Sequence, residues 1–202
     1  MARYSSRSWR AFRPRDGLES IALTVTECRV LGIDPGSQRT GFGIIDCLAG
    51  GERHVASGCI DVAGRAMVVR LQRIYADINA LVIEHRPDMI AIERVFLHRN
   101  PDSALKLGQA RGVALCAAAS LGASVHEYAP RAIKMAVTGY GAAAKPQVAQ
   151  MVRTLLQLES LLGADAADAL AAALCHSQTR RLGSLGALAA EQAAVATRTG
   201  AR

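Results

Sequence analysis

The sequence is poor in aromatic residues and has no cysteine pair at metal-binding spacing. Phe, Trp and Tyr make up 4% of its 202 residues, and its five cysteines are scattered, none of them in a Cys-x-x-Cys arrangement. Scattered cysteines in odd number argue against a disulfide framework and a zinc site, and favour reduced thiols in a cytoplasmic protein. No apolar run approaches the ~20 residues that span a bilayer, so we expect no membrane anchor.

The positive charge is concentrated at the two ends of the chain. Residues 1–28 carry five arginines against three acids, and residues 180–202 carry four against one, whereas residues 29–179 hold 15 basic and 13 acidic residues. We therefore expect a disordered extension over 1–28, one domain over 29–179 and a flexible basic tail over 180–202. A basic balance favours a nucleic-acid partner, although solvated tails have the same composition.

The hydrophobic pattern predicts strands and helices in a mixed order. Short apolar runs joined by tight turns predict an antiparallel meander, and apolar residues at three- and four-residue spacing predict helices. The expected strands cover 30–33, 42–47, 53–60, 88–93 and 124–128, and the expected helices cover 65–86, 101–121, 131–137, 146–158 and 165–177. This order predicts an α/β fold, a mixed five-stranded sheet of three antiparallel strands followed by parallel βα units, with helices on both faces.

The expected helix over 101–121 is crowded with Gly and Ala. Its N-cap is Asn100 or Asp102, since both residue types accept hydrogen bonds from free helix N–H groups. Small residues allow another element to approach closely. That element is either the sheet or a second copy of the chain, and the pattern leaves both open.

Four carboxylates stand where chemistry is expected. Asp34 and Glu93 end two predicted strands, and if these strands are parallel neighbours, both acids emerge at the sheet edge where α/β proteins bind ligands. Asp165 and Asp168 interrupt an Ala- and Leu-rich helix three residues apart, which places them on one face. Taken singly, each strand-end acid also fits an ordinary surface residue, and Asp165 fits a helix cap.

A cluster of these acids requires positive charge. Two carboxylates ~4 Å apart repel by roughly 4 kcal/mol at an effective dielectric near 20. Two divalent cations would remove the conflict, and hard oxygen ligands favour Mg²⁺ or Mn²⁺. Such an ion pair promotes displacement at phosphorus. The acids therefore predict a two-metal phosphodiester hydrolase.

The segments GIDPGSQRTGFGIID, AIERVF, NPDSALKLGQARGVAL and GADAADALAAAL together resemble the RuvC family of bacterial Holliday-junction resolvases over residues 29–177. The resemblance implies an RNase H-like fold, a homodimer, and symmetric nicking of four-way DNA junctions in recombination and repair. It also implies two Mg²⁺ ions per subunit, which Mn²⁺ can replace, and the RuvA–RuvB branch-migration complex as a partner. By position, the catalytic and metal-binding acids are Asp34, Glu93, Asp165 and Asp168.

The same resemblance implies three DNA-contacting residues. Phe96 lies just past Glu93, where an aromatic ring would stack on unpaired bases at the crossover. Lys134 and Lys145 flank a glycine loop and would lie near the scissile phosphate. The alternatives are a Phe96 ring folded onto the core and two solvated lysines.

Two other functions fit parts of the pattern. An actin- or sugar-kinase-like phosphotransferase also has an Asp-x-Gly turn after its first strand, but it needs two such domains and a second such turn. A non-catalytic junction-binding protein would have lost at least one of the four carboxylates, and none is lost here.

Overall fold

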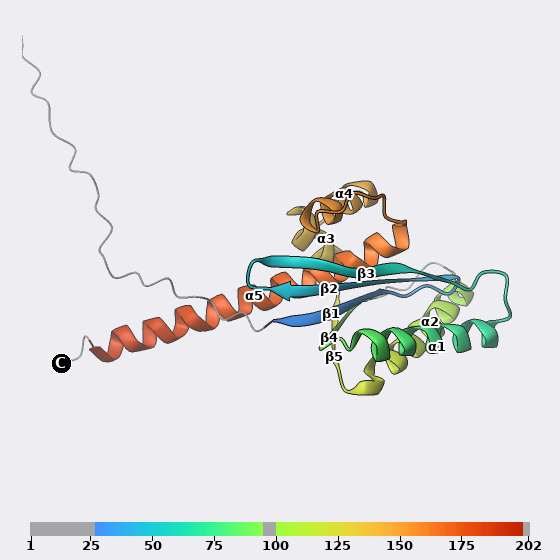
Figure 1. The fold of residues 1–202 in the computed structure, drawn as a ribbon, viewed down its shortest axis with the longest axis horizontal. Helices are drawn as coiled ribbons and strands as arrows, with labels where there is room; N and C mark the ends of the chain where they lie inside the picture. Colours follow the sequence, from blue (N-terminus) through green and yellow to red (C-terminus); the bar gives the residue numbers. More distant parts are fainter. Residues whose placement is uncertain (1–26, 95–99, 200–202) are drawn as a thin grey trace, which may run out of the picture.

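The computed structural model describes residues 27–94 and 100–199. Its centre is a five-stranded sheet in the order β3-β2-β1-β4-β5 (Figure 1). β1 pairs antiparallel with β2 and parallel with β4, while β2–β3 is antiparallel and β4–β5 parallel. The strands are β1 (Cys28–Asp34), β2 (Arg39–Leu48), β3 (Gly51–Asp61), β4 (Met89–Glu93) and β5 (Ser124–Tyr128). The predicted mixed sheet is confirmed, and Cys28 belongs to β1.

The five α-helices begin and end at recognisable signals. They are α1 (Met67–His85), α2 (Pro101–Ala118), α3 (Pro130–Thr138), α4 (Lys145–Leu155) and α5 (Ala164–Thr199). The Asn100 side chain accepts hydrogen bonds from the backbone N–H groups of Asp102 and Ser103, so Asn100 is the cap of α2. A short 3-10 turn, Ala119–Leu121, follows α2. Within residues 27–94 and 100–199, no helix is both long and apolar enough to cross a membrane.

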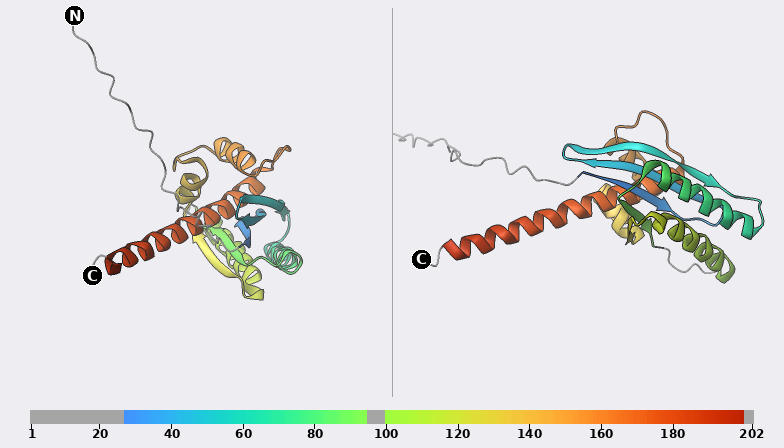
Figure 2. Two further views of the ribbon diagram at one scale, coloured as in Figure 1. Left: turned by 60° about the vertical axis from the view of Figure 1, so that its left-hand side comes forward. Right: turned by 60° about the horizontal axis from the view of Figure 1, so that its bottom comes forward.

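The sheet separates two hydrophobic cores. One core holds Ile33 and Ile44 of the sheet together with buried side chains of α1 and α2. The other holds Val30 and Ala91 of the sheet together with buried side chains of α3, α4 and α5. Figure 2 shows the two groups of helices on opposite faces of the strands. The expected helices on both faces are therefore confirmed.

Helix α5 lies close against the sheet at glycine positions. Gly32 and Gly43 are directly paired across β1 and β2. A Cβ atom at Gly32 would lie 2.0 Å from the carbonyl oxygen of Ala169, and one at Gly43 would lie 2.6 Å from the Leu170 side chain. Any side chain here would lift the helix, so glycine sets how closely α5 approaches the sheet.

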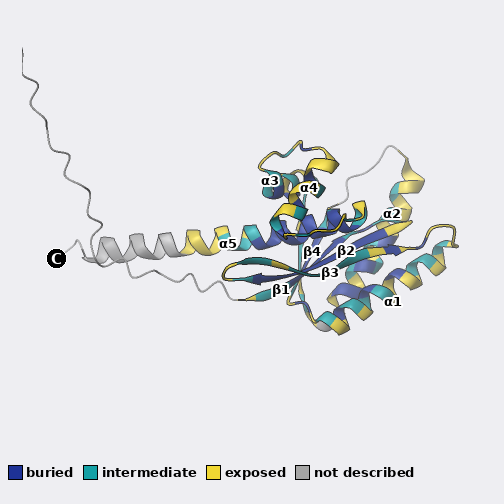
Figure 3. Cartoon of the chain, turned by 45° about the horizontal axis from the view of Figure 1, so that its top comes forward, coloured by how far each residue is buried: buried dark blue, intermediate teal, exposed yellow. Residues whose placement is uncertain are grey.

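Helix α5 is longer than the sequence predicts. The expected end was residue 177, whereas the helix continues to Thr199 and projects beyond the sheet in Figure 1. Figure 3 shows that the part of α5 against the sheet is the buried part. The Arg181 guanidinium anchors this extension by contacts to Glu52 and to the backbone oxygen of Leu48. The alanine-rich segment tolerates Gly183 and Gly186, each costing about 1 kcal/mol, because alanine is the best helix former. The expectation of a flexible tail over 180–202 stays a prediction.

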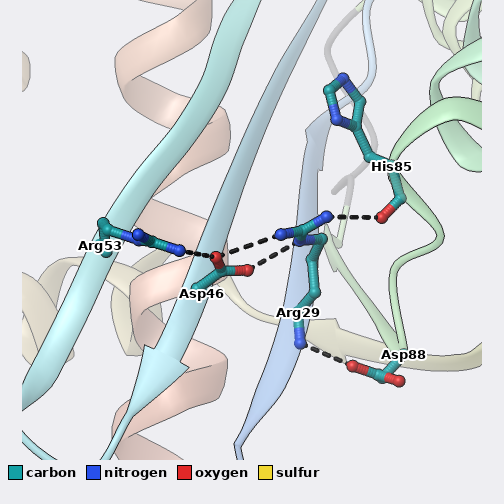
Figure 4. A network of polar contacts seen from close by, with 5 residues as sticks. All are labelled: Arg29, Asp46, Arg53, His85 and Asp88. Atoms are coloured by element: carbon teal, nitrogen blue, oxygen red, sulfur yellow. Dashed lines mark hydrogen bonds and ion pairs between the residues drawn. The ribbon is translucent and has the colours of Figure 1, made fainter.

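A charged network joins neighbouring strands near the start of β1, at the opposite end of that strand from Asp34 (Figure 4). The Arg29 guanidinium donates to both carboxylate oxygens of Asp46, at 2.7 and 3.1 Å, and to the backbone oxygen of His85 at 3.0 Å. Arg53 reaches the same carboxylate at 2.8 Å. The Arg29 hydrogen bond is the main reason that the pKa of Asp46 lies below its usual range. The network fixes β1 against β2, β3 and the end of α1.

Candidate active site

The register of β1 and β4 brings Asp34 and Glu93 together. Ile33 pairs with Ile92 in this parallel ladder, so the next residue on each strand is Asp34 or Glu93. Both acids lie two residues beyond a position that faces the α5 side of the sheet, Gly32 or Ala91. Because side chains alternate along a strand, both carboxylates are directed to that side. The expected meeting of these two strand ends is confirmed.

Asp168 joins the pair from α5. The backbone of α5 lies against β2 as well as β1, since a Cβ atom at Gly41 would lie 2.0 Å from the carbonyl oxygen of Asp165. Gly41 is the direct partner of Asp34 across β1 and β2. The close approach of the helix therefore places its first turns over the end of β1, where Asp168 interacts electrostatically with both strand acids.

Burial and mutual repulsion perturb the two strand acids. The pKa of Asp34 is raised to about 8, mainly by burial and then by the charges of Glu93 and Asp168. The pKa of Glu93 is also raised, again mainly by burial. The two carboxyl groups share a hydrogen bond, in which protonated Asp34 donates to Glu93. Near neutral pH the pair therefore retains a proton.

Two lysines border the acids. Lys145 Nζ lies 2.6 Å from Asp168 Oδ2, and this hydrogen bond is the main reason that the pKa of Lys145 is raised. Lys134 and Lys145 both act to lower the pKa of Glu93. Glu93, Lys134, Lys145 and Asp168 line one small cavity of about 60 Å³. The two predicted lysines thus lie at the acidic cluster, and their contact with DNA stays a prediction.

Asp165 has a different neighbour. It lies one helical turn before Asp168, and its Oδ2 atom accepts a hydrogen bond from the Cys59 thiol at 3.4 Å. Burial, followed by this hydrogen bond, raises the pKa of Cys59 to about 11. Sequence reasoning missed Cys59. The only signal was register, because Cys59 pairs with Gly41, which in turn pairs with Asp34.

The acids supply the ligand chemistry of a divalent cation. Within the described ranges, no three His, Cys, Asp or Glu side chains are arranged as ligands of one metal ion. The charges nearest the carboxylates are the proton retained by Asp34 and the Lys145 ammonium on Asp168. A divalent cation would replace both, and carboxylate oxygens are the ligands that Mg²⁺ and Mn²⁺ prefer. The donor set therefore fits such an ion by its chemistry.

One predicted site residue cannot be placed. Phe96 lies outside the described residues, between Arg94 and Asn100. Its predicted role in base stacking follows from the resemblance alone. Arg94, the last described residue before it, is exposed, and its Nε atom lies 3.6 Å from Oε2 of Glu127 in β5.

The sheet order, with helices on both faces, defines an RNase H-like domain. A family model described as crossover junction endodeoxyribonuclease RuvC matches residues 30–176. The chain belongs to this RuvC family. Membership decides against the phosphotransferase alternative.

Individual relatives agree with the family assignment. The crossover junction endodeoxyribonuclease RuvC of Tolumonas auensis is 52% identical over 152 residues, covering 75% of this chain and 88% of the relative. That of Alkalilimnicola ehrlichii is 51% identical, covering 73% and 90%. The solved structure of Thermus thermophilus RuvC in complex with a Holliday junction substrate superposes with a TM-score of 0.72 at 35% identity, covering 78% of this chain and 97% of that one.

Proposed function

We propose that the protein resolves four-way DNA junctions by paired, symmetric nicks, through Mg²⁺-dependent hydrolysis of phosphodiester bonds in homologous recombination and repair. The observation that carries this proposal is the meeting of Asp34, Glu93 and Asp168 at one sheet edge. Three acids there disfavour a bound phosphate unless cations accompany it. We also propose that the protein acts in the cytoplasm.

The residues divide into metal-binding acids and phosphate-binding cations. Asp34, Glu93, Asp165 and Asp168 would hold two Mg²⁺ ions, with Mn²⁺ as a substitute. When bound, such ions activate the attacking water and stabilise the leaving oxygen. Asp34 must release its proton to act as a ligand, and Lys145 must leave Asp168. The freed Lys145 ammonium would then lie at the edge of the site, where it can bind a phosphate oxygen together with Lys134.

Phe96 would recognise the crossover. A base stacked on an aromatic ring gains ~1–3 kcal/mol without any sequence preference, which suits an enzyme that selects DNA by shape. Substituting Phe96 by Ala should slow cleavage of junctions while leaving the melting temperature unchanged. Phe96→Trp should restore cleavage, because the larger ring stacks equally well. Unchanged cleavage by Phe96→Ala would remove the stacking role.

We further propose that α2 forms the interface of a homodimer. The small residues of this helix divide between two faces. Ala110, Ala114 and Ala117 are buried in the core, whereas Gly108 and Gly112 are exposed, and an added Cβ on either would meet nothing. Beside Gly108, the exposed Leu105 helps to line a surface depression of about 530 Å³. Two copies of such a face can pack closely, as helices with small residues do.

The dimer is tested by mass in solution. Gly108→Glu should convert the dimer to a monomer in light scattering, because it buries a charge in the interface. Gly50→Glu, on an exposed turn with nothing near its added side chain, is the matched control and should stay dimeric. If both variants keep the wild-type mass, α2 is not the interface.

The RuvA–RuvB complex is proposed as a partner on family membership alone. A junction already bound by RuvA and RuvB should be cleaved at least as fast as a free junction. Cleavage blocked by the bound complex would contradict the partnership.

The central experiment is cleavage of a synthetic mobile junction with and without Mg²⁺. We expect two nicks at symmetric positions on opposite strands, and none after chelation of divalent ions. Binding without nicking at any Mg²⁺ or Mn²⁺ concentration would favour the non-catalytic alternative.

A further inference from the structure

Two cysteines face each other across β1 and β2, at the end of the strands that is remote from the acids. Cys28 begins β1, and its direct partner across the antiparallel ladder is Cys47 of β2. Both are free thiols, and the two side chains are in hydrogen-bond contact. Cys47 is buried, with 2% of its surface exposed, whereas Cys28 is partly exposed.

The register places the two cysteines at a backbone separation that a disulfide can bridge. Directly opposed residues of an antiparallel pair have Cα atoms about 4.5 or 5.5 Å apart. Disulfides accept Cα separations of roughly 4.4–6.8 Å. The bond can therefore form without moving either strand. Cys59 and Cys116 differ, because both are exposed and Cys59 is hydrogen-bonded to Asp165.

Cys28 can be reached from the solvent, and a cation lies beside its sulfur. Cys28 lines a surface pocket of about 450 Å³ together with Arg29, Asp46 and Arg53, the residues drawn in Figure 4. The Arg180 guanidinium of α5 contacts its sulfur. Cations beside a partly exposed sulfur are the setting in which reactive cysteines occur. Cys47 is buried, and burial raises the pKa of its thiol to about 12, whereas Cys28 is partly exposed, so Cys28 is the thiol that an oxidant meets first.

We propose that Cys28 and Cys47 are an oxidative modification site, which closes to a reversible cross-strand disulfide on exposure to hydrogen peroxide. The Cys28 sulfur takes one oxygen atom from the peroxide to give a sulfenic acid, and the first water leaves. The Cys47 sulfur then attacks that sulfur and displaces hydroxide, which combines with the thiol proton as a second water. Two electrons and two protons, together two hydrogen atoms, leave the protein, and a thiol reductant restores both cysteines.

The disulfide would lock β1 to β2 without reaching the acids. Asp34 lies six residues along β1 from Cys28, which is about 20 Å in a strand. We therefore expect unchanged active-site chemistry and a higher melting temperature. A bond that closes a loop of this size should raise it by roughly 5–10 °C.

The test is to treat the full chain with hydrogen peroxide, label the remaining thiols and map the digest by mass spectrometry. We expect a mass about 2 Da lower, the loss of two hydrogen atoms, with a Cys28–Cys47 linked peptide that dithiothreitol cleaves. Three of the five thiols should remain available for labelling after unfolding. The melting temperature should rise with the same time course as the linked peptide.

Three variants make the assignment specific. Cys28→Ser should form no linkage and show no rise in melting temperature, and Cys47→Ala should leave a Cys28 sulfenic acid that dimedone traps. Cys59→Ser, the control, should form the bond as the wild type does. A linkage that uses Cys59 or Cys116, an intermolecular bond, or an unmodified Cys28 at peroxide levels that oxidise free cysteine would each overturn the proposal.

Discussion

The ammonium nitrogen of Lys145 lies 2.6 Å from Oδ2 of Asp168, one of the acids proposed to bind metal. The lysine begins α4 and the aspartate lies in the second turn of α5. Lys145 therefore supplies part of the positive charge that the clustered carboxylates require. We propose that it becomes available for a phosphate when a divalent cation takes over that role.

Lys145→Met should separate catalysis from stability. Loss of a cation that is proposed to contact the reacting phosphate should lower the cleavage rate by roughly 10²-fold. The ion pair is largely exposed on the lysine side, so the free energy of unfolding should fall by at most ~1 kcal/mol. Single-turnover cleavage and denaturant melts check the two effects. Arg73→Met removes a comparable ion pair with Asp77 on α1 and should leave cleavage unchanged.

Asp34→Asn should abolish cleavage and leave junction binding equal or tighter. The substitution removes a metal ligand and also an anion that faces the phosphate. Gel-shift titration and a nicking assay on the same junction measure both effects. A variant that nicks at the wild-type rate would show that Asp34 is not in the active site.

The same variant should change how stability depends on pH. The pKa of Asp34 is raised from 3.8 to about 8 in the folded chain, so the folded state keeps a proton that the unfolded state releases. Stability from this group is therefore present below pH 4 and is lost as pH rises toward about 8. Without divalent ions, Asp34→Asn should exceed the wild type in stability at pH 8 and approach it near pH 4. Parallel pH profiles for the two proteins would contradict the raised pKa.

Removing residues 1–26, which precede the described part of the chain, should leave junction cleavage unchanged. The residues after this segment already form β1. A large loss of activity in the truncated protein, with an unchanged melting temperature, would instead assign the segment a role in binding DNA.

The sequence predicted β1 and β4 because each contains a short apolar run, and it predicted the β2–β3 hairpin from the glycine turn between the two strands. Asp34 and Glu93 could be paired because both stand at strand ends, and parallel neighbours bring such ends together. The surroundings of Asp165 were harder to predict. Helical spacing puts Asp165 on the same face as Asp168, but it does not show that the Asp165 carboxylate accepts a hydrogen bond from the Cys59 thiol. The length of α5 was missed, because its anchors on Glu52 and Leu48 come from β2 and β3, far away in sequence.

Gly32→Ala should destabilise the fold strongly. The new methyl group would lie 2.0 Å from the carbonyl oxygen of Ala169, and backbone cannot yield as a side chain can. Overpacking of this kind costs about 1–3 kcal/mol or more. Gly50→Ala is the matched control, since a Cβ there meets nothing and its turn is exposed. Denaturant melts should separate the two variants, and equal stabilities would show that α5 is not held by this contact.

The glycine contact between α5 and the sheet has a consequence for how this enzyme can vary. At Gly32 and Gly41 the main chain of α5 sets the height of the helix above the sheet, and at Gly43 the Leu170 side chain also limits it. Substitutions among aliphatic residues that do not touch these glycines can therefore accumulate while the spacing of the acids stays constant. Because Gly32, Gly41 and Gly43 have no side chains, the distance between α5 and the sheet is fixed at these positions, and so is the spacing between the acids of the helix and the acids of the strands.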